Sequence, residues 1–385
     1  MASPVLRASS TSATIRMQLR KYAVKYAQPG RKARLHCAAG LLTAAAPKAA
    51  AGPEVLSQNF LRSVSYDELD VHTPIAYELY QGPLARWAHS NGQQPSQHQA
   101  PPTAVMVHGI LGNRKNMASF AKMIVEGFPS WQVLMVDLRC HGESASLPTR
   151  SDGPHDVDSA GGDVLELLRR LRLFPRVLIG HSFGGKVVMS MVKQFPQRLP
   201  RPVQVWVLDS LPGQVRAGGG PEGGDHPGAL IDFLRSIPMP VAGRNEVIDA
   251  VVRAGFSLNV ARWVVTNLRP TRAGAAYGSG PLTWGFDLDG IADMYSSYES
   301  TALWDVVQRP PEGLSLDFVK AERSTFRWGG SDEAAITGAG HRVHLLPNSG
   351  HWVHADNPLG LYDILAPSFG GSSDLKQRRS AAVRT

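Results

Sequence analysis

Between Thr103 and Ser210, short apolar runs alternate with amphipathic stretches. The runs "TAVMVHG", "VLMVDLR", "RVLIGHS" and "VQVWVLDS" have the length and composition of buried strands, and helical spacing fills residues 116–127, 158–171 and 184–195. Strands that alternate with helices predict a mostly parallel sheet with helices on both faces. The chain is therefore expected to be an α/β protein.

After Ser210 this alternation stops for about a hundred residues, and "ALIDFLRSI", "EVIDAVVRAGF" and "LNVARWVVTNL" read as short amphipathic helices. The sheet pattern returns with "LSLDFVKAE" and "RVHLLPNSGHW", and a helix over "LGLYDILAPSF" closes it. With two opening strands in "FLRSVSYDEL" and "IAYELYQG", the interruption follows the sixth strand. We expect one domain over 54–370, with a surface insertion at Ser90–Pro102 and a helical cap at about 211–305.

The positive charge of the chain is concentrated at its start. Residues 1–53 hold nine of the 40 Lys and Arg and no acid, which leaves 31 basic residues against 32 acidic ones. This Ala-, Ser- and Arg-rich leader predicts a transit peptide, for a chloroplast or alternatively a mitochondrion; a disordered arm is the other interpretation. The near-neutral remainder favours no nucleic-acid partner, and no run of about 18 apolar residues predicts a transmembrane segment. The tail over 371–385 is basic and expected to be frayed.

The strongest chemical signal is the sequence "IGHSFGG". It contains G-x-S-x-G, with Gly180, Ser182 and Gly184 placed directly after an apolar strand and before a helix. The motif needs this context, because the serine must stand on a tight strand-to-helix turn where neighbouring side chains would collide. Ser182 is therefore the candidate nucleophile, and the helix N-terminus beneath it can stabilise negative charge.

A serine hydroxyl needs a base, and "PNSGHWVHADNP" offers His351 and His354. His351 stands in a turn directly after the last strand and follows Ser182 in chain order, which favours it as the base. His354, three residues further on, is expected to be peripheral.

Two backbone amides are expected to bind the developing oxyanion. One belongs to Phe183, the residue after the nucleophile, and the second comes from the loop after "TAVMVHG". That loop reads Gly109, Ile110, Leu111, Gly112. We assign the second donor to Ile110, with Leu111 as the alternative.

Three acids could orient the histidine. After "LSLDFVKAE", where this acid often lies, the chain offers only Glu322 in the first turn and Asp332 some eight residues later. One strand earlier, Asp209 ends "VWVLDS" at the same edge of the sheet as the nucleophile. Asp209 is the preferred partner of His351, with Asp332 as the alternative and Glu322 behind both.

Taken together, "VHGILG", "DLRCHGES", "GHSFGGK" and "GHWVHADNP" resemble the α/β-hydrolase superfamily over residues 60–369. Within it, the chain is most similar to the group of abhydrolase domain-containing protein 11. The resemblance implies a serine ester or thioester hydrolase with a helical cap. It also agrees with Asp209 as the acid and gives Ser324 an auxiliary hydrogen-bonding role near the histidine. One departure is Cys140, where related sequences usually have Gly; its thiol is expected to fill the turn.

These residues predict a two-step acyl transfer by Ser182, His351 and Asp209 on a small acyl ester or thioester, with no metal or cofactor. Phe233, Leu234, Phe256 and Trp263 of the cap suggest an apolar acyl pocket, or serve only to pack the cap. An acyltransferase, a plastid pigment or phytyl ester hydrolase, and a receptor-like binding module that retains the triad are the alternatives. The two cysteines, Cys37 and Cys140, predict no disulfide framework, because cleavage of the leader would leave Cys140 alone.

Overall fold

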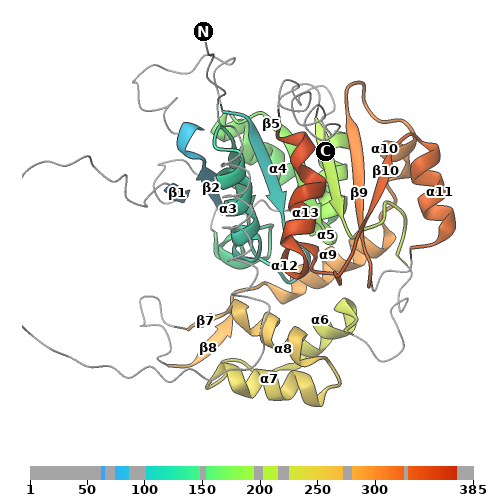
Figure 1. The fold of residues 1–385 in the computed structure, drawn as a ribbon. Coiled ribbons are helices and arrows are strands. Elements are labelled where there is room, and N and C mark those ends of the chain that lie inside the picture. Colours follow the sequence, from blue (N-terminus) through green and yellow to red (C-terminus); the bar gives the residue numbers. More distant parts are fainter. Residues whose placement is uncertain are drawn as a thin grey trace, which may run out of the picture. The chain divides into compact units, whose positions relative to one another are not determined.

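The sheet that organises the molecule is mostly parallel. The structure is a computed structural model that describes residues 62–65 by their backbone, and residues 74–85, 101–147, 153–194, 203–215, 225–271, 280–324 and 328–370 in full. Within these ranges eight strands pair in the order β1-β2-β4-β3-β5-β6-β9-β10 (Figure 1). β2 pairs antiparallel with β1 and with β4, and the other neighbours are parallel. The strands are β1 Arg62–Ser65, β2 Tyr77–Gln81, β3 Thr103–Val107, β4 Gln132–Val136, β5 Pro175–His181, β6 Gln204–Leu208, β9 Ser315–Ala321 and β10 Arg342–Leu346.

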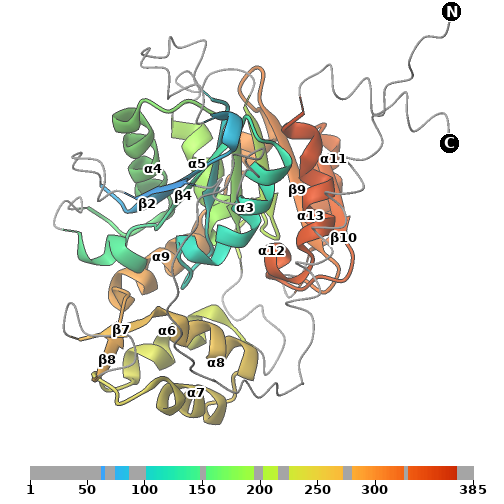
Figure 2. The same cartoon turned by 60° about the vertical axis from the view of Figure 1, so that its left-hand side comes forward.

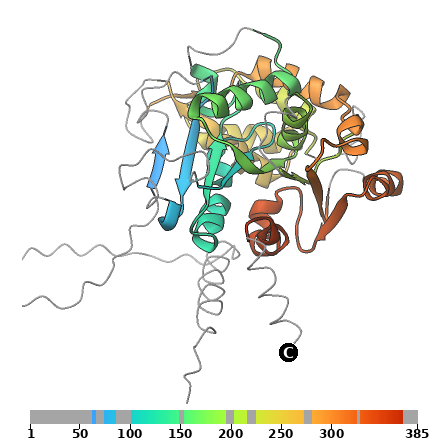
Figure 3. The ribbon, with the colours of Figure 1, turned by 90° about the horizontal axis from the view of Figure 1, so that it is seen from above.

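Helices cover both faces of this sheet, as the alternating pattern predicted. Figure 3 shows α3 (Ala118–Gly127) and α13 (Pro358–Leu365) on one face, and α4 (Val157–Leu171) and α5 (Phe183–Gln194) on the other. Every residue of β3 and β4 is buried between these layers, which is why both read as continuous apolar runs. Shorter helices connect the layers: η2 Arg114–Met117, η3 Gly142–Ser146, α10 Trp304–Gln308, α12 Val353–Asp356 and η5 Ala366–Ser368.

The chain between β6 and β9 forms the cap and returns to the core. The three predicted short helices are present as α6 (Pro227–Ser236), α7 (Arg244–Arg253) and α8 (Leu258–Val264), followed by η4 (Val265–Asn267). A two-stranded antiparallel sheet of β7 (Leu268–Pro270) and β8 (Leu282–Trp284) and a long helix α9 (Leu288–Ser300) were not predicted. Figures 1 and 2 show α6, α7 and α8 beyond one end of the sheet strands.

Helix α9 joins the cap to the core. It packs against α4 and α5 and also against α6 of the cap. Lys186 of α5 is buried and donates to the carbonyl oxygens of Tyr298 and Thr301, where α9 ends. The free carbonyls at a helix C-terminus attract a cation, so this contact fixes the end of α9 on the nucleophile helix.

Helix α11 (Gly330–Gly338), between β9 and β10, is another element that the sequence did not predict. Its only buried residue is Ile336, so it has no apolar stripe with helical spacing. Asp332, the alternative acid, lies in the first turn of α11, where its carboxylate accepts the Gly329 N–H at 3.1 Å.

Several expectations concern other parts of the chain. The leader over 1–53 with Cys37, the surface insertion up to residue 100, and the tail over 371–385 all lie outside the described residues. Of the helices that are described, none is both long enough and apolar enough to cross a membrane.

Candidate active site

Ser182 stands on a sharp turn between β5 and α5. Its φ angle is 53°, in the left-handed region that non-glycine residues rarely adopt, and its N–H donates to the Leu208 carbonyl at 2.9 Å. A Cβ at Gly180 would collide with the Gly184 carbonyl, and one at Gly184 would collide with the Val107 carbonyl. Gly180 therefore lets β5 pack closely on the first turn of α5, and Gly184 lets that turn approach the end of β3. The turn holds the Ser182 side chain at the edge of the sheet.

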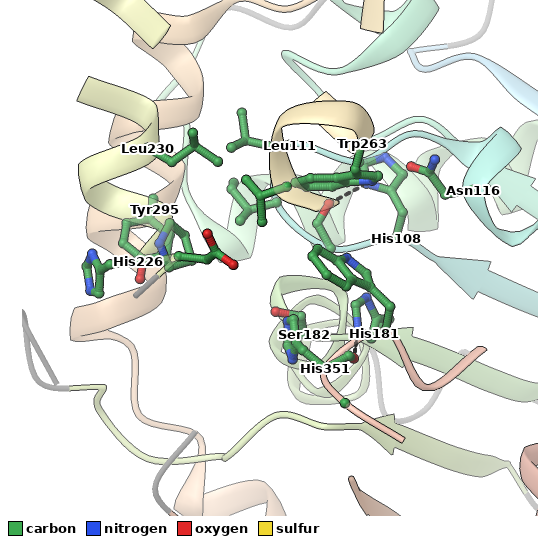
Figure 4. Close-up of a pocket in the computed structure, with 18 of the residues that line it drawn as sticks. His108, Leu111, Asn116, His181, Ser182, His226, Leu230, Trp263, Tyr295 and His351 are labelled. Atoms are coloured by element: carbon green, nitrogen blue, oxygen red, sulfur yellow. Dashed lines mark hydrogen bonds between the residues drawn. The ribbon is translucent and has the colours of Figure 1, made fainter. Parts of the chain in front are cut away.

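His351 and Asp209 form a hydrogen-bonded pair beside this turn. His351 Nδ1 lies 2.8 Å from Asp209 Oδ2. Because a carboxylate accepts, Nδ1 carries the proton and Nε2 is left as the basic nitrogen. Figure 4 shows the labelled side chains of Ser182 and His351 next to one another. The structure thus brings together the three residues that the sequence proposed as nucleophile, base and acid.

The Asp209 carboxylate is fully buried and held by further donors. Ser324 Oγ donates to Oδ2 at 3.0 Å, and the Ala321 N–H donates to Oδ1 at 3.2 Å. The Asp209 backbone has a positive φ of 45°, and the Asp209 N–H donates to the Val319 carbonyl at 2.7 Å. Ser324 thus bonds to the same carboxylate oxygen as His351, next to the histidine, where the resemblance implied an auxiliary hydrogen-bonding residue. These bonds fix the carboxylate and, through it, the imidazole.

The other two acids are engaged elsewhere. Asp332 lies at the wall of the cavity, but its carboxylate bonds to the start of its own helix. Glu322 is exposed and accepts the Asn348 N–H at 2.7 Å. The structure pairs the imidazole of His351 with Asp209 and gives both alternatives other partners.

The loop after β3 approaches the nucleophile closely. A Cβ at Gly109 would lie 3.2 Å from Ser182 Cβ and 3.1 Å from His181 Nδ1, so only glycine fits easily. Ile110 follows and lines the same cavity. Phe183 is the first residue of α5, and the N–H groups of a first helical turn have no acceptor within their helix. Ile110 and Phe183 thus stand in the loop beside Ser182 and at the first turn of α5, and their amides remain the candidate oxyanion donors.

His141 holds the next residue of this loop. The Leu111 N–H donates to His141 Nε2 at 3.0 Å, so the alternative oxyanion donor already has an acceptor. His141 Nδ1 lies 2.8 Å from the Arg139 carbonyl, which can only accept, and Nδ1 therefore carries the proton. Burial, reinforced by the neighbouring His108, lowers the pKa of His141 to about 3. The ring is neutral at physiological pH and can accept the amide.

His108 repeats this arrangement. Its Nδ1 faces the Gly109 carbonyl at 2.8 Å, its Nε2 accepts the Leu138 N–H at 3.0 Å, and burial lowers its pKa. The His108 and His141 rings meet edge to face with centroids 5.0 Å apart. Sequence reasoning assigned a role to neither. The available signal was their place in the two loops that follow β3 and β4.

His354, expected to be peripheral, is buried, and that expectation was wrong. Its ring packs edge-on against His181, with centroids 4.9 Å apart. His181 Nε2 in turn donates to the His351 carbonyl at 2.7 Å. Burial lowers the pKa of His354 to about 4 and that of His181 well below its usual value. Two neutral rings therefore support the segment that carries His351.

A cavity of about 890 Å³ opens above Ser182. Figure 4 shows Leu111, Leu230 and Trp263 among its walls, with Ser182 and His351 on the core side. Of the cap residues expected to form an acyl pocket, Trp263 lines this cavity. Phe233 and Phe256 pack against each other with ring centroids 5.9 Å apart, and Leu234 is buried in the core cluster. A cavity with apolar side chains in part of its wall, next to Ser182 and His351, suits acyl transfer.

A separate group of potential metal ligands, Cys140, His155 and Asp287, lies outside the lining of this cavity.

Comparisons with known proteins agree with this fold. Residues 104–364 match the sequence model of the alpha/beta hydrolase family. The sn-1-specific diacylglycerol lipase ABHD11 of Mus musculus is 26% identical over 336 residues, which cover 85% of this chain and 94% of that protein. Esterase YbfF of Escherichia coli (strain K12) is 23% identical over 266 residues, covering 68% and 91%. The solved structure of a marine microorganism esterase superposes with a TM-score of 0.58 at 20% identity, covering 77% of this chain and 99% of that one.

The match to the family model extends over about two thirds of the chain and includes both Ser182 and His351. The predicted α/β-hydrolase fold and the similarity to the ABHD11 group are confirmed, and relatives that are esterases and lipases support hydrolase activity. The chain therefore belongs to the alpha/beta hydrolase family.

Proposed function

We propose that the protein is a serine hydrolase that cleaves carboxylic esters or thioesters through an acyl-enzyme. The observation that carries this proposal is the 2.8 Å bond between His351 and the buried Asp209, placed beside Ser182 on its left-handed turn. A carboxylate that fixes the Nδ1–H tautomer leaves Nε2 to act as a base toward the serine.

In the proposed reaction, His351 Nε2 takes the Ser182 proton while Oγ attacks the acyl carbonyl. The amides of Phe183 and Ile110 bind the resulting oxyanion, and Asp209 stabilises the imidazolium. The imidazolium then gives its proton to the departing alcohol or thiol, which leaves an ester on Ser182. A water molecule repeats the attack with the same base, and the acid is released as Ser182 regains its proton.

The walls of the cavity support an apolar acyl group. Leu211, Leu230, Val260 and Trp263 line it, and its volume falls within the range of sites for drug-sized ligands, about 300–1,000 Å³. The mouse relative is a diacylglycerol lipase by name. Diacylglycerols and medium-chain acyl esters are therefore the first substrates to test, with acyl-CoA thioesters beside them.

A fluorophosphonate probe tests the nucleophile directly. We expect the wild-type protein to be labelled and the Ser182→Ala variant to remain unlabelled. Failure to label the wild type, or undiminished labelling of the variant, would refute the assignment. A panel of p-nitrophenyl, diacylglycerol and CoA esters of graded chain length then identifies the substrate. Labelling without turnover of any member would favour a binding module, and ester formation on adding alcohols would favour an acyltransferase.

The acid is tested by a matched pair of variants. Asp209→Asn is expected to lower kcat by roughly 10⁴-fold, the loss seen when the orienting carboxylate of a serine triad becomes an amide. Asp332→Asn is the control, because this side chain bonds to the start of α11. Near-normal kcat in Asp209→Asn with a collapse in Asp332→Asn would reverse the assignment.

A further inference from the structure

Three potential metal ligands converge where the core meets the cap. Among the described residues, Cys140 Sγ, a ring nitrogen of His155 and a carboxylate oxygen of Asp287 all lie within 4.8 Å of one another. Cys140 belongs to the loop after β4, His155 precedes α4, and Asp287 is the N-cap residue directly before α9. The Cys140 thiol is buried, whereas His155 and Asp287 are partly exposed as residues.

The backbone around this group leaves room for the three side chains to meet. Gly290 lies in the first turn of α9, and a Cβ there would collide with Cys140 Sγ. The same Cβ would lie 3.0 Å from His155 Cδ2 and 3.2 Å from an Asp287 oxygen. The Asp287 N–H also donates to the Cys140 carbonyl at 2.9 Å, which ties the two segments together by their main chains.

Cys140 occupies a backbone conformation that favours glycine. Its φ angle is 65°, in the left-handed region, so the thiol is held there against a backbone preference. The Cys140 side chain takes no part in the proposed acyl transfer.

The donor set selects a class of ion. A thiolate, an imidazole and a carboxylate suit a borderline-soft divalent transition metal such as Zn²⁺, whereas Mg²⁺ and Ca²⁺ prefer oxygen ligands alone. Tetrahedral Zn²⁺ with its usual bond lengths separates its ligand atoms by about 3.4–3.6 Å. The distances between the three ligand atoms, up to 4.8 Å, would have to shorten by about 1 Å to reach this spacing. Rotation of the partly exposed His155 and Asp287 side chains can provide this shortening.

We propose that Cys140, His155 and Asp287 form a binding site for a zinc-class divalent ion that joins cap helix α9 to the loop after β4. One proton leaves the Cys140 thiol for solvent as the metal–sulfur bond forms, and the fourth position is taken by water. The ion connects two parts of the catalytic region. Cys140 is adjacent to His141, which holds the oxyanion loop, and α9 carries Tyr295, which lines the cavity.

Co²⁺ binding to the full-length chain tests the site, because Co²⁺ bound to a thiolate gives a charge-transfer absorption in the near ultraviolet. The chain has two cysteines, so the Cys37→Ser variant serves as the reference background. In that background we expect one Co²⁺ per chain, the thiolate band, and displacement of Co²⁺ by Zn²⁺. Absence of the thiolate band would overturn the proposal.

Substitutions in the same background assign the ligands. Cys140→Gly suits the left-handed backbone and should abolish the band while the chain remains folded. His155→Gln and Asp287→Asn should each weaken Zn²⁺ binding by more than about tenfold, since losing a residue that only orients a ligand already costs about 10–100-fold. Asn can still accept the Gly290 N–H as a helix cap, so Asp287→Asn keeps the start of α9.

Asp289→Asn is the matched control, because it removes the same charge two residues after Asp287. The Asp289 side chain is exposed and pairs with Arg235. The Zn²⁺ affinity of this variant should equal that of the reference. A band that persists in Cys140→Gly, or an affinity that is unchanged in both His155→Gln and Asp287→Asn, would overturn the proposal. Circular dichroism without metal verifies the fold of each variant. His155 is partly exposed, so His155→Gln is expected to remain folded.

Discussion

Replacing His141 by Phe should separate the support of the oxyanion loop from the rest of the catalytic machinery. The imidazole accepts the Leu111 N–H at 3.0 Å and donates to the Arg139 carbonyl at 2.8 Å. Phenylalanine has a similar shape and can keep the edge-to-face contact with Phe286, whose ring centroid is 5.8 Å away. The substitution therefore removes two buried hydrogen bonds without opening a large cavity.

The size of the effect follows from these two bonds. A buried polar group left without a partner costs about 1–3 kcal/mol, so the two orphaned groups should lower the free energy of unfolding by about 2–6 kcal/mol. At about 2 °C per kcal/mol for a large domain, Tm should fall by about 4–12 °C. If the freed loop also withdraws the Ile110 amide from the oxyanion, kcat should fall by up to about 10²–10³-fold, the cost of one such donor.

The assay is kcat and KM on an activated ester such as a p-nitrophenyl ester, measured beside Tm. His341→Phe is the control, because His341 is also buried and its Nε2 bonds to the Val307 carbonyl at 2.8 Å, but it lies before β10 and does not line the cavity. This control should lose stability and keep its kcat. If His141→Phe loses stability but retains kcat within about threefold, the bond to Leu111 does not position an oxyanion donor, and the reasoning is wrong.

Three further predictions concern acid stability, the cap and the oxyanion loop. Because burial lowers the pKa of His141 to about 3 and of His354 to about 4, the unfolded chain binds protons that the folded chain refuses below pH 6.5. In urea unfolding, the contribution of these histidines to the free energy of unfolding should be constant above pH 7 and should fall by about 3 kcal/mol per histidine by pH 4.5. A free energy of unfolding that does not change between these pH values would contradict this. Lys186→Met leaves two carbonyls at the end of α9 without their donor and should cost about 2–6 kcal/mol, measured by the same unfolding assay; no loss would mean that Lys186 does not anchor α9. Gly109→Ala adds a methyl group 3.2 Å from Ser182 Cβ and should lower kcat by about tenfold with little change in Tm, whereas normal kcat would show that the loop yields freely.

The sequence alone was sufficient for the features that local pattern controls. Runs such as "TAVMVHG" and "RVLIGHS" are buried on both faces, so their apolar continuity revealed β3 and β5, and the turn at Ser182 was recognisable because G-x-S-x-G needs glycines within two residues of the serine. Helix α11 was not predicted, because a helix that buries only Ile336 shows no apolar residues at helical spacing.

The hydrogen-bonded partners required the tertiary structure. Asp209 follows β6 and His351 follows β10, and the two are 142 residues apart. They meet because β6, β9 and β10 are consecutive parallel strands of the sheet, which places their carboxyl ends at one edge. The burial of His354 against His181 and the bond from Leu111 to His141 likewise depend on which loops the sheet order makes neighbours. Local composition determined which chemical groups this chain has and on which turns they stand. The order of the strands decided which of them touch, because contact between distant segments is fixed by how the strands pack and not by the residues that flank each group.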